Sequence, residues 1–362
     1  MRYLIALLAV AVLLAACGQS PTAPASLTPT GSLATGGRLV VMTHDSFSVS
    51  KTVLAAFEQS TGVTVEVLKV GDAGKMLNQA ILSKAAPVAD VLFGVDNTFL
   101  SRALAAEILL PYAAPALASL PADLKLDPSN RLLPIDYGYV AINYDRAALT
   151  AAGLTPPTSL EELTKPMWRG KLVVENPATS SPGLAFLLAT IAHFGTGPSY
   201  SWRDFWRDLR NNEVYVSEGW SDAYNAQFSG SSGKGPYPLV VSYSTSPAAE
   251  VFFSDGKLKE PPTGNVLVPG GVFRQVEFVG ILKGTNNEAL ARRFIDFMLQ
   301  PAFQADIPLQ MFVYPVDAAV ALPQVFTNFA TVPAQPAGMT AAQIEQGREA
   351  WITQWTKLVL QQ

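Results

Sequence analysis

Short apolar segments alternate with amphipathic segments through most of the chain. Residues 38–44, 63–70 and 90–95 are rich in Val and Leu and have the length and composition of buried strands. Between them, residues 51–60 and 76–81 place apolar side chains at helical spacing. Because strands that alternate with helices form a parallel sheet covered by helices, we expect an α/β fold.

Two apolar runs, at 133–144 and 273–283, are longer than the other strand patterns. A second α/β series lies between them, and we expect these two long strands to cross between two lobes. The first lobe would be built from residues 38–137 and 276–362, and the second from residues 138–275. Further strands are predicted at 171–175, 214–219 and 239–244, and helices at 286–299 and 340–359.

The first residues have the pattern of an export signal. Arg2 precedes an uncharged apolar run that is shorter than the about 20 residues of a membrane span. We therefore expect a signal peptide over residues 1–16. The run ends at Cys17 in the order Leu-Ala-Ala-Cys, which resembles a bacterial lipobox and predicts lipid attachment to Cys17. An ordinary signal peptide with a chance cysteine is the alternative. Residues 17–37 are uncharged and rich in Pro, Thr, Ser and Gly, which is typical of a flexible tether.

Composition excludes several classes of protein. The chain of 362 residues has a formal net charge of -4, which argues against a nucleic-acid partner. It contains one cysteine and two histidines, so it has no disulfide framework and no histidine-rich metal site. Dinucleotide, Walker, nucleophile-elbow and zinc-protease motifs are absent. We expect no cofactor, no bound metal and no catalytic residue, although paired carboxylates leave a hydrolase open.

Polar and aromatic side chains follow several predicted strands. The carboxyl ends of strands in open α/β sheets meet at one cleft, where aromatic rings beside carboxylates suit a flat cationic ligand. Each residue also has a structural interpretation: Asp45, Asp72 and Ser180 as helix caps, the aromatic residues as packing residues, and His44 as a polar lining residue. The candidates taken from these clusters are His44, Asp45, Asp96, Tyr137, Ser180, Trp220 and Tyr243.

Eight short motifs occur in an order that resembles the bacterial thiamine-binding proteins, the substrate-binding subunits of thiamine ABC transporters. The resemblance runs from about residue 38 to 358. It implies a type II periplasmic-binding-protein fold, capture of thiamine or its phosphates, and ligand contacts from Asp72, Ser180, Trp220 and Tyr243. The motifs are THDSF (43–47), GVDN (94–97), DYGYVAINYD (136–145), NPATSSPGL (176–184), GWSDAY (219–224), SYSTSPA (242–248), FMLQPAFQADIP (297–308) and YPV (314–316).

Three positions depart from enterobacterial members of that family. His44 and Ala249 replace tyrosines, and Phe312 replaces a tryptophan. A pocket opened at Ala249 would also accept a bulkier thiamine relative, a pyrimidine precursor or another cationic heterocycle. We include Phe312 among the predicted ligand-binding residues.

These observations together predict an extracytoplasmic solute-binding lipoprotein. We expect a monomer, anchored on the periplasmic or cell-surface side of a membrane, that captures thiamine or its phosphate esters between two lobes and delivers it to an ABC permease. A polyamine or iron is the alternative ligand, because related two-lobed proteins bind them. A secreted cleft hydrolase using paired aspartates is the alternative from another class, and it would consume its ligand.

Overall fold

The computed structural model describes residues 37–230 and 235–361. The predicted signal peptide, Cys17 and all of the tether except Gly37 lie outside the described residues. In the part of the chain that is described, no helix combines the length and the apolar character needed to cross a membrane.

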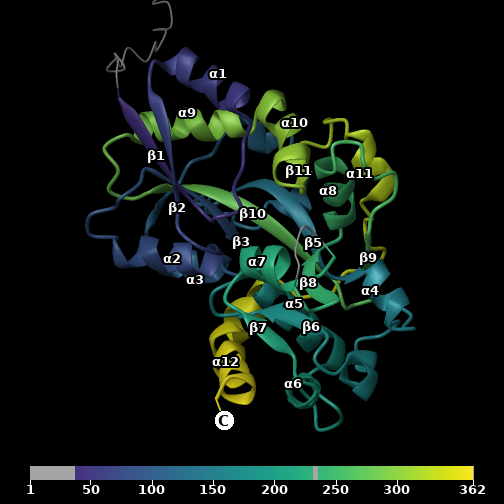
Figure 1. The fold of residues 1–362 in the computed structure, drawn as a ribbon. Helices are drawn as coiled ribbons and strands as arrows, with labels where there is room; N and C mark the ends of the chain where they lie inside the picture. The colour runs from purple at the N-terminus through teal and green to yellow at the C-terminus, as the bar shows by residue number, and fades with distance from the viewer. Residues whose placement is uncertain (1–36, 231–234, 362) are drawn as a thin grey trace, which may run out of the picture. The chain divides into compact units, whose positions relative to one another are not determined.

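The described strands form a single sheet (Figure 1). Three short strands pair at its side: β4 (Leu109–Leu110) with β10, and β9 (Thr263–Val266) and β11 (Tyr314–Pro315) with β5. The main order is β2 (Thr64–Lys69), β1 (Arg38–Thr43), β3 (Val91–Asp96), β10 (Phe273–Leu282), β5 (Leu133–Asp145), β8 (Leu239–Tyr243), β6 (Leu172–Glu175) and β7 (Tyr215–Ser217).

The directions of the strands divide the sheet into two parallel groups. β1 is parallel to β2 and β3, and β6 is parallel to β7 and β8. The long strands β10 and β5 lie between these groups and are antiparallel to their neighbours. We call the part built on β1–β3 the first lobe and the part built on β6–β8 the second lobe. The predicted two-lobed α/β fold of type II, with two long strands at its centre, is confirmed.

Helices pack on this sheet, and the sequence explains where several begin and end. Helix α1 starts after Ser50, whose hydroxyl accepts a hydrogen bond from the Val53 amide, and ends at Gly62 with φ +71°. The helices are α1 (Lys51–Thr61), α2 (Ala73–Leu82), α3 (Leu100–Ala105), α4 (Arg146–Ala151), α5 (Ser181–Phe194), α6 (Trp202–Asn211), α7 (Trp220–Asp222), α8 (Ser246–Phe253), α9 (Glu288–Met298), α10 (Pro301–Gln310), α11 (Gln324–Phe329) and α12 (Ala341–Val359).

Helix α5 is central to the second lobe because it is apolar on all sides. Its residues from Ser181 to Ile191 are buried, and it packs against β5, β6, β8 and β10. A helix without a polar face can lie only in an interior. The N-terminus of α5 therefore lies beside the two long strands, close to the junction of the lobes.

Helix α12 contacts both lobes. Its Trp355 packs edge-on against Trp206 of α6, with ring centroids 5.4 Å apart. One to two turns earlier, the buried guanidinium of Arg348 lies 4.6 Å from the ring centroid of Phe99, directly before α3. Figure 1 shows α12 in yellow on the side of α6. The long C-terminal helix thus connects α3 of the first lobe with α6 of the second lobe.

Candidate ligand-binding cavity

A cavity of about 490 Å³ lies between the lobes and beside β5 and β10. Small-molecule sites occupy roughly 300–1,000 Å³, so this cavity has the size of a small-ligand site. Six of the nine predicted ligand-binding residues line it: His44, Asp45, Asp72, Trp220, Tyr243 and Phe312.

The other three predicted residues are placed differently. Ser180 is fully buried directly before α5, while its neighbour Ser181 lines the cavity. Asp96 is fully buried at the end of β3 and accepts hydrogen bonds from the amide and the hydroxyl of Thr98. Tyr137 stacks on Tyr314 with ring centroids 5.3 Å apart and does not line the cavity.

Strand alternation explains why Tyr137 is excluded. Successive side chains of a strand point to opposite faces, so Tyr137 lies on the face opposite to its neighbours Asp136 and Gly138. Those two residues line the cavity, as do Gln275 and Glu277 of β10. The polar residues Gln275 and Glu277, at positions i and i+2 on one face of a buried strand, were the signal that could have identified the β10 pair.

One wall of the cavity consists of stacked aromatic rings held by hydrogen bonds. Trp220 stacks on Tyr224 with centroids 5.1 Å apart and planes inclined by 12°. The indole Nε1 donates to Ser242 Oγ at 2.9 Å, and the Tyr243 hydroxyl donates to Gln275 Oε1 at 3.0 Å. Tyr224 lies in a π-helical turn (Ala223–Gln227), a rare conformation that often occurs at functional sites. These bonds fix the orientation of the rings, so they form a rigid stacking surface.

A second group of aromatic rings lies at the end of α8. Phe253 lines the cavity yet remains 65% exposed, and its ring centroid is 5.1 Å from that of Phe312. Ala249 lies one helical turn earlier and also lines the cavity. The small side chain of Ala249 therefore leaves space next to a partly uncovered aromatic ring.

The cavity is strongly acidic. Its lining includes the carboxyl groups of Asp45, Asp72, Asp136, Glu250 and Glu277. Among the described residues that line it, His44 is the only basic side chain, and there is no Lys or Arg. A concave surface with charges of one sign concentrates ligands of the opposite sign. The cavity is therefore suited to a cation.

Buried carboxyl groups form a row across the three central strands. Glu277 of β10 is paired in register with Asp96 of β3 on one side and with Asp136 of β5 on the other. Burial raises the pKa of Asp136 well above its usual value, and the adjacent Glu277 raises it further. Burial likewise raises the pKa of Asp96 to about 6. Burial and the neighbouring carboxyl group thus both favour the protonated form of Asp136.

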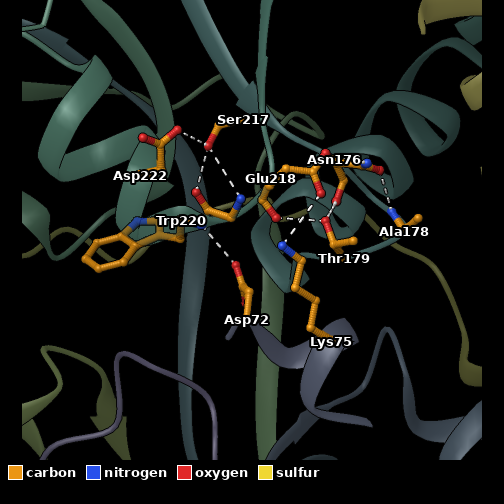
Figure 2. Close-up of polar contacts among 10 residues, drawn as sticks. Asp72, Lys75, Asn176, Ala178, Thr179, Ser217, Glu218, Trp220 and Asp222 are labelled. Carbon is orange, nitrogen blue, oxygen red and sulfur yellow. Dashed lines mark hydrogen bonds and ion pairs between the residues drawn. The ribbon is translucent and has the colours of Figure 1, made fainter. Parts of the chain in front are cut away.

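Asp72 joins the two lobes as well as lining the cavity (Figure 2). One of its carboxylate oxygens accepts a hydrogen bond from the Ala73 amide at 2.7 Å, which caps α2. The other accepts from the amide of Trp220, in the second lobe, at 2.9 Å. Burial raises the pKa of Asp72, although the Trp220 amide opposes that shift. Asp72 is therefore both a helix cap and a cavity residue.

Other contacts between the lobes surround Asp72. The Gly74 amide donates to the Thr179 carbonyl at 3.0 Å, and Lys75 Nζ lies 3.7 Å from Glu218 Oε2. Figure 2 shows α2 meeting the segments that follow β6 and β7 at this point. On the other side of Asp72, the hydroxyls of Ser46 and Ser221 are 3.4 Å apart. The lobes therefore touch directly along one edge of the cavity.

Comparisons with known proteins identify the family. Residues 86–331 match the family described as bacterial extracellular solute-binding protein. The chain belongs to this family. It is 32% identical to the thiamine-binding periplasmic protein of Salmonella typhimurium over 326 residues, which cover 89% of this chain and 93% of the relative. The resemblance to thiamine-binding proteins is thereby confirmed.

Structural comparison gives the same result. The fold matches a structure named periplasmic thiamin binding protein with a TM-score of 0.78 and 31% identity, covering 89% of this chain and 96% of that chain. A more distant relative is iron uptake protein A1 of Synechocystis, 24% identical over 330 residues that cover 88% of this chain and 85% of the relative. Because the family consists of solute-binding proteins, the prediction of a binding protein rather than an enzyme is confirmed.

In the two described ranges, no three His, Cys, Asp or Glu side chains are placed to hold a metal ion.

Proposed function

We propose that this solute-binding protein captures thiamine, or a phosphate ester of thiamine, in the acidic cavity and delivers it to an ABC permease. The observation that carries the proposal is the combination of five cavity carboxyl groups with a fixed aromatic wall. Thiamine has a permanently cationic thiazolium ring and a flat aminopyrimidine ring. A flat cation gains stacking and cation–π contacts from such a wall and charge balance from the carboxylates.

Individual residues would have distinct roles in this complex. Trp220 and Tyr243 would contact the ligand rings, and Asp72 would balance the thiazolium charge. A phosphate ester would place its anionic group at the N-terminus of α5, where Ser181 lines the cavity. Closure of the lobes over the ligand would complete these contacts, because they come from both sides of the junction.

Iron is the alternative ligand, since iron uptake protein A1 is also similar to this chain. Thiamine is favoured because the thiamine-binding relatives are more similar in sequence and in structure. The cavity also offers the stacked rings of Trp220 and Tyr224, which suit a flat organic cation, and the described residues include no group of three His, Cys, Asp or Glu side chains placed to hold a metal ion.

We further propose that the protein is a lipoprotein. Acylation of Cys17 would anchor it on the outer side of a membrane through the tether, and two acyl chains would hold it firmly. The lobes would be formed by residues 38–137 with 276–362 and by residues 138–275, with β5 and β10 as the hinge.

Identification of the bound molecule is the decisive test. Mass spectrometry of small molecules released from the purified protein should detect thiamine or its phosphate esters. Calorimetric titration of the emptied protein with thiamine should then show saturable binding without turnover. Recovery of a different solute together with an absence of thiamine binding would overturn the proposed ligand and leave the family assignment intact.

A further inference from the structure

His44 is the only basic side chain among the described residues that line the cavity. It follows β1, and its ring lies against the backbone of Gly94, where a Cβ would come within 2.3 Å of His44 Cδ2. Gly94 has φ +107°, so a glycine is needed there for both its conformation and its small size. His44 Nε2 lies 3.1 Å from Glu277 Oε1, with both side chains largely buried.

Three acidic groups face His44, whereas β3 presents the Phe93 ring to it. Asp45 is next to it in the chain, Asp72 approaches from α2, and Glu277 approaches from β10. Behind Glu277 lie Asp136 of β5 and Asp96 of β3. Three further titratable groups lie near this cluster: the Tyr243 hydroxyl of β8, the buried Glu175 of β6 near Asp72, and Arg348 of α12 near Asp96. The described neighbours of His44 are thus acidic or neutral.

The empty cavity favours a charged His44. Burial has the largest single effect on the pKa of His44 and lowers it, but the hydrogen bond and charge of Glu277, together with the charges of Asp72 and Asp45, raise it, and the net pKa lies above the usual 6.5. A cationic ligand in the same cavity would approach the same carboxylates. Two like charges held close together in a partly buried site repel each other, and only His44 can relieve the repulsion by losing its proton.

We propose that His44 sets the charge of the cavity: it is an imidazolium when the cavity is empty and gives up its proton when a cationic ligand binds. This inference rests on the proposed function, because it takes the ligand to be a cation. The proton leaves Nε2 for bulk solvent, and the Glu277 carboxylate that it had faced becomes available to the ligand. The ligand's positive charge therefore replaces that of His44.

The coupling between ligand binding and proton release determines how the affinity for the ligand changes with pH. Because binding releases a proton, the affinity for a cation rises with pH over the range in which His44 is charged in the free protein and neutral in the complex. The rise is up to about tenfold per pH unit for one proton. His44 would thus favour cations over neutral analogues of the same shape most strongly at higher pH.

The full-length protein can test this by calorimetry with thiamine as the probe. Titrations at one neutral pH, in buffers of low and high ionisation enthalpy, should give different apparent enthalpies that correspond to release of about one proton. His44→Gln should bind thiamine with the same apparent enthalpy in both buffers. His193→Gln is the matched control, because His193 is the only other histidine and lies outside the cavity beside Glu161.

Nuclear magnetic resonance provides a direct readout, because a chain with two histidines gives two sets of imidazole signals. Thiamine should shift the His44 signal to the neutral form at neutral pH and leave His193 unchanged. Thiamine binding with equal enthalpies in both buffers would overturn the inference and leave the proposed function standing. So would proton release that persists in His44→Gln, since Asp136 or Asp96 would then be the source. A wild-type protein that does not bind thiamine would overturn both.

Discussion

Gly74 in the first lobe lies against Thr179 in the second lobe so closely that a side chain at position 74 would overlap with it. A Cβ on Gly74 would be 2.8 Å from the carbonyl oxygens of both Ala178 and Thr179. The approach is what allows the Gly74 amide to donate to the Thr179 carbonyl. The direct contact between the lobes therefore depends on the absence of one methyl group.

Gly74→Ala should act as a wedge that holds the lobes apart. The overlap is with backbone atoms, which cannot rotate away, so we expect a larger radius of gyration by small-angle scattering with saturating thiamine and weaker thiamine binding. Gly197→Ala is the control, because a Cβ there meets no atom within 4 Å. Identical scattering curves for the two variants would show that the lobes adjust without opening.

Trp220→Ala should weaken thiamine binding by about tenfold or more. A stacking or cation–π contact contributes roughly 0.5–2 kcal/mol, and the Tyr224 ring would lose the partner that orders it. The Trp220 amide that binds Asp72 remains in the variant, so the contact between the lobes should persist. Calorimetric titration measures the change, and circular dichroism checks that the fold is retained. Unchanged affinity would remove Trp220 from the binding surface.

Phe253→Ala should weaken binding by about three- to tenfold, because an aromatic contact contributes roughly 0.5–1.5 kcal/mol. Phe252→Ala is a matched control, since Phe252 precedes it, also packs near Phe312 and does not line the cavity. We expect the control to change affinity by less than about twofold. Equal effects of the two substitutions in thiamine titrations would assign Phe253 to packing alone.

Asp96→Asn should make the free energy of unfolding less dependent on pH. The pKa of Asp96 rises from 3.8 to about 6 on folding. Its stabilising contribution to the free energy of unfolding is therefore fully present below pH 3.8 and is lost as the pH rises through 6. The loss is about 3 kcal/mol. Asparagine keeps an oxygen to accept from Thr98 and has no charge to bury. Urea unfolding at about pH 4 and about pH 7 should show the variant gaining stability relative to wild type only at the higher pH. A constant difference at both pH values would contradict the expected ionisation.

Cys17→Ser should release the protein from membranes into the soluble fraction. Serine has no thiol to receive the acyl chains on which the proposed anchoring depends. Fractionation followed by immunodetection measures the change. A variant that remains in washed membranes would exclude lipid attachment at Cys17.

Sequence periodicity was sufficient to predict most of the fold. The predicted strands at 38–44, 133–144 and 273–283 correspond to β1, β5 and β10 within one or two residues. Their patterns were visible because each strand is buried along most of its length and is rich in apolar residues. The two-residue strands β4 and β11 were missed, since pairs this short carry no pattern of their own.

The residues that line the cavity were predicted less completely than the fold. The reasons are the strand face on which a side chain lies and the separation in sequence of residues that meet in the cavity. In β5 the residue type favoured Tyr137, but strand alternation placed Asp136 on the cavity face instead. Glu277 lies far from Asp136 in sequence, and only the register between β10 and β5 brings them together. Phe253 could not be recognised, because an aromatic residue at a helix end is as typical of packing as of binding.

The packing of α12 has a consequence for how the two lobes move relative to each other. Strand β1 lies in the first lobe, whereas the last residues of α12 lie against α6, where Arg210 donates to the Leu358 carbonyl at 3.0 Å. A probe on β1 and a probe on α6 would therefore report the separation of the two lobes, and α12 packs against both. Because α12 contacts Phe99 in the first lobe and Trp206 in the second, it links the two lobes. Shortening this helix from its C-terminus should therefore change the rate at which the cavity opens before it changes the affinity for the ligand.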